Sequence, residues 1–278
     1  MFKEFKIFKN KKIIVTGHTG FKGSWLCIWL KLLGAKVYGI SLKPITEPSH
    51  YKCTNLKQNI EKSFIFNIQN KQKLKKIIKT IKPDFLFHLA GQSIVKESYH
   101  DPINTWKTNV LGTINVLESL RQLKKCTAIL ITSDKCYKNM EYFKGYHEND
   151  KLGGEDPYSA SKASAEIAIY SYFKTYFVNS RIKISSVRAG NVIGGGDWSE
   201  DRLIPDIFRF YNRKKNIYLR NPFSVRPWQH VLEPLSGYLS LAERVYNRNF
   251  KKLTPNWNFG PNLSSCKSVK YIANYFSK

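Results

Sequence analysis

Apolar residues follow two alternating patterns along the chain: short runs rich in β-branched and aromatic residues, and longer stretches with apolar residues at helical spacing. The short runs predict strands and the longer stretches predict helices. Strands that alternate with helices of ten or more residues are typical of a parallel sheet covered on both faces. The sequence therefore predicts an α/β fold. The expected strands are 12–16, 36–40, 64–66, 85–89, 128–132 and 182–187, and the expected helices are 22–33, 71–81, 103–123 and 157–177.

The alternation weakens after Gly194, where loops rich in Gly, Pro and Arg and shorter helices replace it. This change predicts two parts of the chain. Residues 1–190 are expected to form a doubly wound, Rossmann-type dinucleotide-binding domain. Residues 191–278 are expected to form a smaller lobe of mixed structure, interleaved with that domain, in which a substrate binds.

The chain carries 46 Lys and Arg against 20 Asp and Glu, a net charge of +26, which raises the question of a nucleic-acid partner. However, 36 of the 46 cations are lysines spread over the whole chain, whereas base readout favours arginine. We interpret the lysines as a solvated surface and expect no nucleic-acid partner. Nine of the ten arginines lie between Arg181 and Arg248, so the C-terminal third is the expected place for an anionic ligand.

The five cysteines are scattered, odd in number and without a CxxC pair, which argues against a disulfide framework and a metal site. No apolar run approaches the roughly 20 residues of a membrane-spanning helix. The N-terminus also lacks the apolar stretch of a signal peptide. We therefore expect a cytoplasmic protein with no membrane span.

A glycine-rich turn with the spacing GxxGxxG connects the first predicted strand to the first predicted helix. The first glycine permits the tight turn, the second lets the backbone approach a pyrophosphate, and the third lets helix and strand pack closely. The N-terminus of the following helix offers N–H groups and the positive end of its dipole to a phosphate. The predicted cofactor-binding residues are Gly17, His18, Thr19, Gly20, Phe21, Lys22 and Gly23.

The second predicted strand lacks the acidic residue that an NAD site usually places at its end. Ser41 can hydrogen-bond a ribose hydroxyl there, whereas Lys43 would accommodate a 2′-phosphate. The choice between NAD and NADP stays open on these residues alone.

A YxxxK pair, Tyr158 and Lys162, stands at the start of the helix predicted from Pro157. The spacing of four places both side chains on one helix face, where the lysine ammonium, together with the positive charge of nicotinamide, is expected to lower the pKa of the tyrosine. Tyr158 then acts as a base for a substrate hydroxyl while a hydride leaves its carbon. Ser133, just beyond the fifth strand, is expected to hydrogen-bond the same hydroxyl.

These motifs resemble the extended short-chain dehydrogenase/reductases, and among them the nucleotide-sugar 4,6-dehydratases, which carry Ser/Thr-Asp-Glu or Ser/Thr-Asp-Lys after the fifth strand. Longer matches over nearly the whole chain resemble the CDP-glucose 4,6-dehydratases. These are GHTGFKGSW (17–25), TSDKCY (132–137), DPYSASKA (156–163), RAGNVIGGGDW (188–198), DRLIPD (201–206) and RPWQHVLEPLSGYL (226–239).

The resemblance implies an NAD-dependent lyase that oxidises carbon 4 of the sugar, eliminates water across carbons 5 and 6, and returns the hydride to carbon 6. Tyr158, Lys162 and Ser133 serve the oxidation. Asp134 is the expected acid for the departing 6-hydroxyl, because a carboxyl in a closed site can have a raised pKa. Lys135 must be neutral to accept the 5-proton, or else it stabilises the enolate as a cation.

The resemblance also implies the remaining contacts. Asn191 is expected at the sugar diphosphate and Arg202 near the nucleotide. Arg226 is expected to bind the pyrophosphate, with His230 behind it, while Arg220 is either a contact or a salt-bridge residue. The implied cofactor residues further include Ser41, Leu89, Ala90 and Gly91, and the implied substrate residues are Gln92, Ser93, Asn191, Arg202, Leu203, Arg220, Arg226 and His230.

Two histidines have separate expectations. His18 is expected to touch the cofactor phosphate or to close the turn over it, and His88, within a predicted strand, is expected to be a packed core residue.

Some features depart from this family. Gly91 replaces an alanine, and Asn67-Ile68-Gln69 lacks an aspartate that contacts adenine, which predicts weak cofactor affinity. Family members continue past residue 278, so part of the substrate lobe is expected to be absent.

The alternatives are a dehydratase or epimerase for another nucleotide sugar, or a non-catalytic nucleotide-binding relative. The resemblance also implies a homodimer or higher homo-oligomer formed through helices 103–123 and 158–177.

Overall fold

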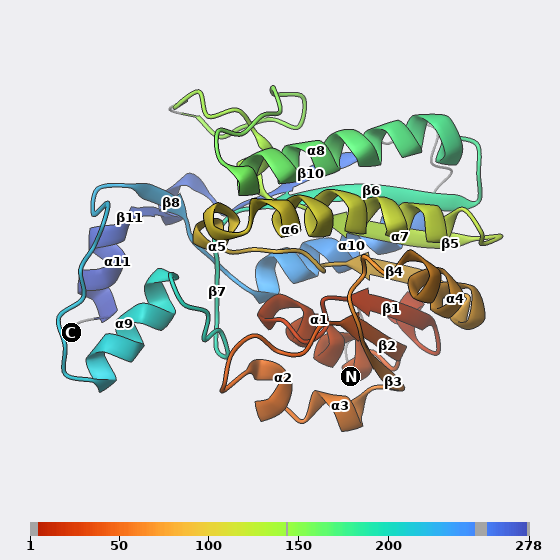
Figure 1. The fold of residues 1–278 in the computed structure, drawn as a ribbon, viewed down its shortest axis with the longest axis horizontal. Coiled ribbons are helices and arrows are strands. Elements are labelled where there is room, and N and C mark those ends of the chain that lie inside the picture. The colour runs from red at the N-terminus through yellow and green to blue at the C-terminus, as the bar shows by residue number, and fades with distance from the viewer. Residues whose placement is uncertain (1–4, 143, 248–254, 277–278) are drawn as a thin grey trace.

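The computed structural model describes residues 5–142, 144–247 and 255–276 (Figure 1). Within these ranges seven parallel strands form one sheet in the order β10-β6-β5-β4-β1-β2-β3. This is the predicted Rossmann-type α/β architecture. The strands are β1 (Lys12–Thr16), β2 (Lys36–Ser41), β3 (Lys62–Ile65), β4 (Phe85–His88), β5 (Cys126–Ile131), β6 (Ile182–Ala189) and β10 (Asn256–Phe259).

Helices cover both faces of the sheet, because successive side chains of a strand point to opposite faces. Ile13 and Val15 of β1 pack in one apolar cluster with α1 (Phe21–Leu32) and α10 (Leu232–Asn247). Ile14 packs in the other, with α4 (Lys71–Ile81), α7 (Gly112–Leu120) and α8 (Pro157–Tyr172). The central strands β1, β4 and β5 are therefore buried on both sides, which explains their nearly continuous apolar sequences.

The helix predicted over 103–123 is interrupted. It consists of α6 (Pro102–Trp106), a π-helical turn η2 (Lys107–Leu111) and α7, and a short helix α5 (Val95–His100) precedes it. The side chain of Asn109 in η2 is buried and donates to Ser161 Oγ at 2.9 Å. Apolar periodicity does not distinguish a π turn from an α turn, so the sequence did not predict this break.

The C-terminal third contributes to both parts of the molecule. β10 and α10 complete the sheet domain, while α9 (Leu203–Asn212) and α11 (Val269–Phe276) lie together beyond the carboxyl ends of the strands (Figure 1). The smaller elements are η1 (Lys6–Phe8), α2 (His50–Cys53), α3 (Leu56–Asn59), η3 (Asp134–Cys136), η4 (Phe173–Phe177), β7 (Val192–Ile193), β8 (Val225–Pro227), β9 (Gln229–His230), η6 (Leu263–Ser265) and β11 (Cys266–Ser268).

Candidate active site

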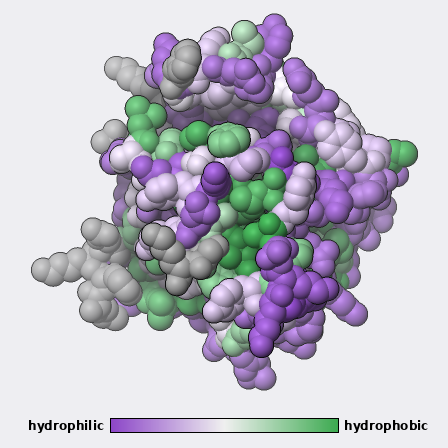
Figure 2. All heavy atoms as spheres, turned by 90° about the vertical axis from the view of Figure 1, so that its left-hand side faces the viewer, coloured by the Kyte–Doolittle hydropathy of each residue, from purple (hydrophilic) through white to green (hydrophobic). Residues whose placement is uncertain are grey.

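The carboxyl ends of the strands open on the left-hand face of Figure 1, which Figure 2 shows directly. Apolar side chains gather in the middle of this face, and hydrophilic side chains surround them (Figure 2). Ligands of open parallel sheets bind at this edge. The predicted glycine turn, Ser133 and Asp134 follow strand ends here, and Tyr158 and Lys162 lie on α8, which packs against η3.

The glycine turn has the backbone geometry that its spacing predicts. Gly17 has a φ of 77°, and a Cβ on it would lie 2.7 Å from the amide nitrogen of Ala90. A Cβ on Gly23 would lie 2.1 Å from the carbonyl oxygen of Gly17, so only glycine lets α1 approach the turn this closely. Gly20 caps α1, and no side chain of the described residues caps that N-terminus. The turn is therefore a narrow cradle with free N–H donors, which fits a dinucleotide pyrophosphate.

The side chain of His18 does not extend over this cradle, contrary to expectation. It is fully buried, its Nε2 lies 2.7 Å from Ser63 Oγ on β3, and burial lowers its pKa to about 4. A Cβ on Gly39 of β2 would lie 2.2 Å from the imidazole, so a glycine at this position leaves the space that the His18 side chain occupies. His18 is therefore turned into the sheet, where a buried imidazole is neutral.

The end of β2 is fixed to the glycine turn. Thr19 Oγ1 lies 2.8 Å from Ser41 Oγ and donates to the carbonyl of Leu42 at 2.9 Å. Ser41 is thus held at the strand end where a ribose is expected, and Lys43 is exposed. These contacts place Ser41, rather than an acidic residue, at the adenosine end of the candidate cofactor site.

The catalytic residues come from two elements that meet at this edge. Ser133 precedes the short turn η3, and its hydroxyl donates to Asp134 Oδ1 at 3.0 Å. Tyr158 and Lys162 lie on the first turns of α8, which Asp156 caps by accepting the amide of Ser159 at 2.9 Å. Tyr158 and Lys162 are both buried, and Tyr158 hydrogen-bonds Ser133. The four predicted residues Ser133, Asp134, Tyr158 and Lys162 are therefore brought together.

The protein alone, without the nicotinamide charge that the expectation includes, raises the pKa of Tyr158. Burial raises it to about 12, and the hydrogen bond with Ser133 only partly opposes that rise. Burial also lowers the pKa of Lys162 to about 8. One dry environment penalises the charged forms of both side chains, so the protein alone does not stabilise the phenolate.

Charged groups from both parts of the molecule lie around Lys22. Burial lowers the pKa of Lys22 on α1 to about 8; the charges of Arg202 and Lys162 lower it further, while Asp134 opposes them. The Lys22 ammonium donates to the hydroxyl of Tyr238 on α10 at 3.4 Å. This excess of cations suits an anionic ligand. Lys135, in contrast, has an exposed side chain.

The predicted substrate residues divide into two groups, of which the first lies near the catalytic residues. Arg202 Nη1 donates to Asp197 at 3.1 Å and Nη2 to Ser93 Oγ at 3.4 Å, and Leu203 begins α9 directly after it. The side chain of Gln92, however, donates to Thr105 Oγ1 at 3.0 Å and is turned toward α6. Gln92 therefore supports the helix rather than facing a ligand.

In the second group, Asn191 and Arg226 adjoin Gly190 and Pro227, which lie beside Asp134: a Cβ on Gly190 would lie 3.3 Å from Asp134 Oδ2 and 2.8 Å from Pro227 Cγ. Arg220 is 67% exposed and pairs with Asp201 at 3.8 Å, in agreement with the salt-bridge alternative. Arg226 on β8 donates to the carbonyl of Val225. Asn191 accepts the amide of Gln229 through its backbone carbonyl. His230 lies against the ring of Trp25 on α1, 6.4 Å between ring centres. No described contact joins these four residues to the catalytic side chains.

His88 is the packed core residue that was predicted. It is buried, its Nδ1 lies 2.7 Å from Thr16 Oγ1 and its Nε2 3.1 Å from Thr113 Oγ1. Burial lowers its pKa to about 3, so the imidazole is neutral.

Asn109 is a site residue that the sequence analysis did not select. Its Oδ1 accepts the amide of Gln92 at 2.8 Å, and a Cβ on Gly91 would lie 3.0 Å from this oxygen and 3.1 Å from the Lys162 ammonium. Gly91 thus gives Asn109 and Lys162 space beside the end of β4. The only sequence signal was an asparagine within the helix predicted over 103–123.

Comparison with known proteins identifies the family to which this chain belongs. The sequence model of the GDP-mannose 4,6-dehydratase family matches residues 14–251. The chain belongs to this family. Within it, a CDP-glucose 4,6-dehydratase of Salmonella typhimurium is 47% identical over 272 residues, which are 95% of this chain and 75% of that protein. A dTDP-D-glucose 4,6-dehydratase of Dictyostelium discoideum is 30% identical over 74% of this chain and 49% of that protein. The predicted relationship to nucleotide-sugar 4,6-dehydratases is confirmed.

Solved structures confirm the fold. The dTDP-glucose 4,6-dehydratase of Bacillus anthracis, in complex with NAD, has a TM-score of 0.78 at 22% identity and covers 95% of this chain and 79% of its own. The UDP-glucose 4-epimerase of Thermotoga maritima, with UDP-glucose, has a TM-score of 0.77 at 22% identity and covers 95% and 80%. Among the described helices, none has the length and apolarity needed to cross a membrane.

Proposed function

We propose that this chain catalyses the NAD-dependent 4,6-dehydration of CDP-glucose to CDP-4-keto-6-deoxyglucose. The observation that carries the proposal is the convergence of Ser133, Asp134, Tyr158 and Lys162 at the sheet edge that also holds the glycine cradle. The 47% identity to the Salmonella typhimurium CDP-glucose 4,6-dehydratase supports the substrate.

The residues of the site divide the reaction between them. The glycine turn from Gly17 to Gly23 would hold NAD, which would supply the acceptor for the hydride of carbon 4 and, once reduced, the donor for carbon 6. Tyr158 takes the proton of the 4-hydroxyl, Ser133 orients that hydroxyl through its bond with Tyr158, and Lys162 supplies positive charge beside the phenol. This charge matters because burial otherwise keeps Tyr158 protonated.

Asp134 is placed for the elimination step. Its carboxyl lies beside Ser133, so a sugar bound to Tyr158 and Ser133 through O4 directs its neighbouring carbons toward Asp134. Asp134 protonates the departing 6-hydroxyl as general acid. Lys135 follows on the same turn. In its neutral form it takes the proton of carbon 5 as the 6-hydroxyl leaves, and it returns a proton to carbon 5 when the hydride reaches carbon 6. Lys22 and Arg202 supply the positive field for the diphosphate.

The substrate is tested with a panel of nucleotide diphosphoglucoses. We expect the purified protein with NAD to convert CDP-glucose to the 4-keto-6-deoxy sugar far faster than the dTDP, UDP or GDP analogues. Chromatography of the released sugar nucleotides measures this. Equal rates across the panel would remove the CDP assignment, and an epimerised product without loss of water would remove the dehydratase assignment.

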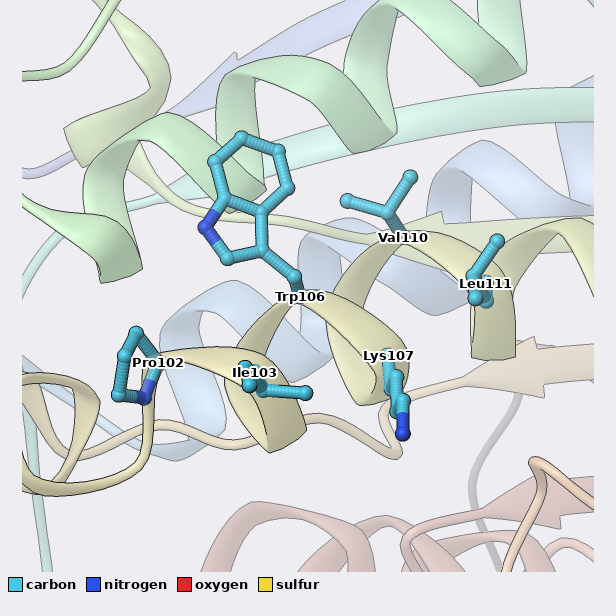
Figure 3. A pocket seen from close by; sticks show the side chains of 6 residues that line it. All are labelled: Pro102, Ile103, Trp106, Lys107, Val110 and Leu111. Carbon is cyan, nitrogen blue, oxygen red and sulfur yellow. The ribbon is translucent and has the colours of Figure 1, made fainter.

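We further propose that the chain acts as a homodimer in the cytoplasm and serves deoxysugar synthesis for polysaccharide. Pro102, Ile103, Trp106, Lys107, Val110 and Leu111 form an apolar hollow on α6 and η2 (Figure 3). Ile103 is 66% exposed and Leu111 51%, and the adjacent α8 exposes Ile167 and Tyr170. Such a continuous apolar face on two neighbouring helices suits a second copy of the chain in a two-fold arrangement.

A charged substitution in this apolar face tests whether the face forms the dimer interface. We expect the parent protein to be dimeric at micromolar concentration by light scattering, and Ile103→Asp to be monomeric because it would bury a charge at the interface. Leu32→Asp is the control, since Leu32 is equally exposed, 67%, at the end of α1. A monomeric parent, or dissociation by both variants alike, would exclude this interface.

A further inference from the structure

A buried ion pair lies directly behind the catalytic turn. Glu166 on α8 and Arg188 on β6 are joined at 2.8 Å between Oε2 and Nη2, and each side chain is 1% exposed. A buried pair is held only if further hydrogen bonds satisfy its charged groups. The partners of this pair therefore show what it fixes in place.

The carboxylate of Glu166 binds the residue that precedes the catalytic serine. Its Oε1 accepts the hydroxyl of Thr132, and its Oε2 accepts the hydroxyl of Ser186 at 2.8 Å. Glu166 follows Lys162 by four residues, as Lys162 follows Tyr158, so all three lie along one face of α8. Glu166 thus ties the helix of the YxxxK pair to the start of the turn.

The guanidinium of Arg188 holds the other end of the same turn. Its Nη1 donates to the hydroxyl of Tyr137 at 2.7 Å, and its central carbon lies 4.9 Å above the Tyr137 ring. Nη1 also donates to the carbonyl of Glu148 at 3.0 Å. Tyr137 follows η3 directly, so the pair contacts both residues that flank the segment Ser133–Cys136.

The backbone hydrogen bonds within the turn from Ser133 to Tyr137 are long. Its internal backbone bonds, from Cys136 to Ser133 and from Tyr137 to Asp134, measure 3.2 and 3.4 Å. These are at or beyond the long end of the usual N–H···O range. The placement of Ser133 and Asp134 against Tyr158 therefore depends on how the two ends of the turn are anchored.

We propose that Glu166 and Arg188 are positioning residues, a buried clamp that sets Ser133 and Asp134 in register with Tyr158 and Lys162. The expected loss of kcat rests on the proposed dehydratase function. The expected loosening of the turn does not. Misplacement of a catalytic group by about 1 Å can cost about 10²-fold in rate, so a loosened anchor is expected to lower kcat.

Two variants that each remove one hydroxyl from the same carboxylate test the clamp. Thr132→Val removes the bond that leads to the catalytic turn, with a bond from the same hydroxyl to the Val187 carbonyl. Ser186→Ala removes the bond from β6 to Glu166, with a bond from the same hydroxyl to Asn256 on β10. We expect Thr132→Val to lower kcat for CDP-glucose about 10-fold with little change in KM, and Thr132→Ser to restore it. We expect Ser186→Ala to lower the melting temperature as much as Thr132→Val while keeping the parent kcat.

Hydrogen exchange supplies a readout that does not need turnover. The peptide that covers residues 132–137 is expected to exchange faster in Thr132→Val and in Tyr137→Phe, and at the parent rate in Ser186→Ala. Equal losses of kcat in Thr132→Val and Ser186→Ala would contradict the proposal that Glu166 and Arg188 position the turn. Unchanged exchange of this peptide in Thr132→Val would also contradict it. If the parent protein does not convert CDP-glucose, the proposed function fails while exchange still decides the clamp.

Discussion

Replacing Asp134 with Asn is expected to lower the release of 4-keto-6-deoxy product by about 10²–10⁴-fold, the usual contribution of a positioned proton donor. Hydroxide is a poor leaving group, so elimination needs an acid beside the 6-hydroxyl, whereas oxidation at carbon 4 does not. The Asn side chain keeps an oxygen for the bond from Ser133, so the turn is expected to keep its shape. CDP-glucose is therefore still expected to be oxidised.

Single-turnover absorbance of the reduced nicotinamide, measured beside product analysis, separates the two halves of the reaction. Asp84→Asn is the matched control, because Asp84 accepts an amide hydrogen bond at the opposite end of the sheet. Parent-rate turnover by Asp134→Asn would show that Asp134 is not the acid. Failure to oxidise the sugar at all would instead assign Asp134 to substrate binding.

Replacing Tyr158 with Phe is expected to block the first step, with a loss of activity of about 10²-fold or more, because no other described group takes the proton of the 4-hydroxyl. The ring stays in place, so α8 and the position of Lys162 are expected to be preserved. Neither reduced nicotinamide nor keto product is expected in single-turnover experiments.

Tyr211→Phe is the control for this variant, since it removes the same hydroxyl from a position on α9 that is 72% exposed and lies outside the proposed dimer face. The parent rate is expected there. Oxidation of CDP-glucose by Tyr158→Phe at a rate near that of the parent would assign the base elsewhere and would leave the YxxxK pair without its proposed role.

The geometry also bears on cofactor affinity. Lys22, Lys162 and Arg202 share one neighbourhood with Asp134, and burial lowers the pKa values of both Lys22 and Lys162 to about 8. A cationic nicotinamide adds charge of the same sign, so this cluster and the missing aspartate near residues 67–69 both favour weak NAD binding.

The sequence by itself determined the features that depend on neighbours along the chain. Strand 12–16 and helix 71–81 have the predicted bounds, because apolar periodicity and the caps act within a few residues. The GxxGxxG spacing and the YxxxK pair were equally readable, since the backbone needs of Gly17 and Gly23 and the helical spacing of Tyr158 and Lys162 are local.

Only the tertiary structure decided what depends on groups far apart in the chain. It placed β10 beside β6, turned His18 toward Gly39 and Ser63, and raised the pKa of Tyr158 by burying it. Glu166 was recognisable in the sequence, because it continues the four-residue spacing of Tyr158 and Lys162. Its partner Arg188 was not, because it lies 22 residues away on another element. Burial and charge pairing arise when distant segments meet, so neither could be read from a local pattern.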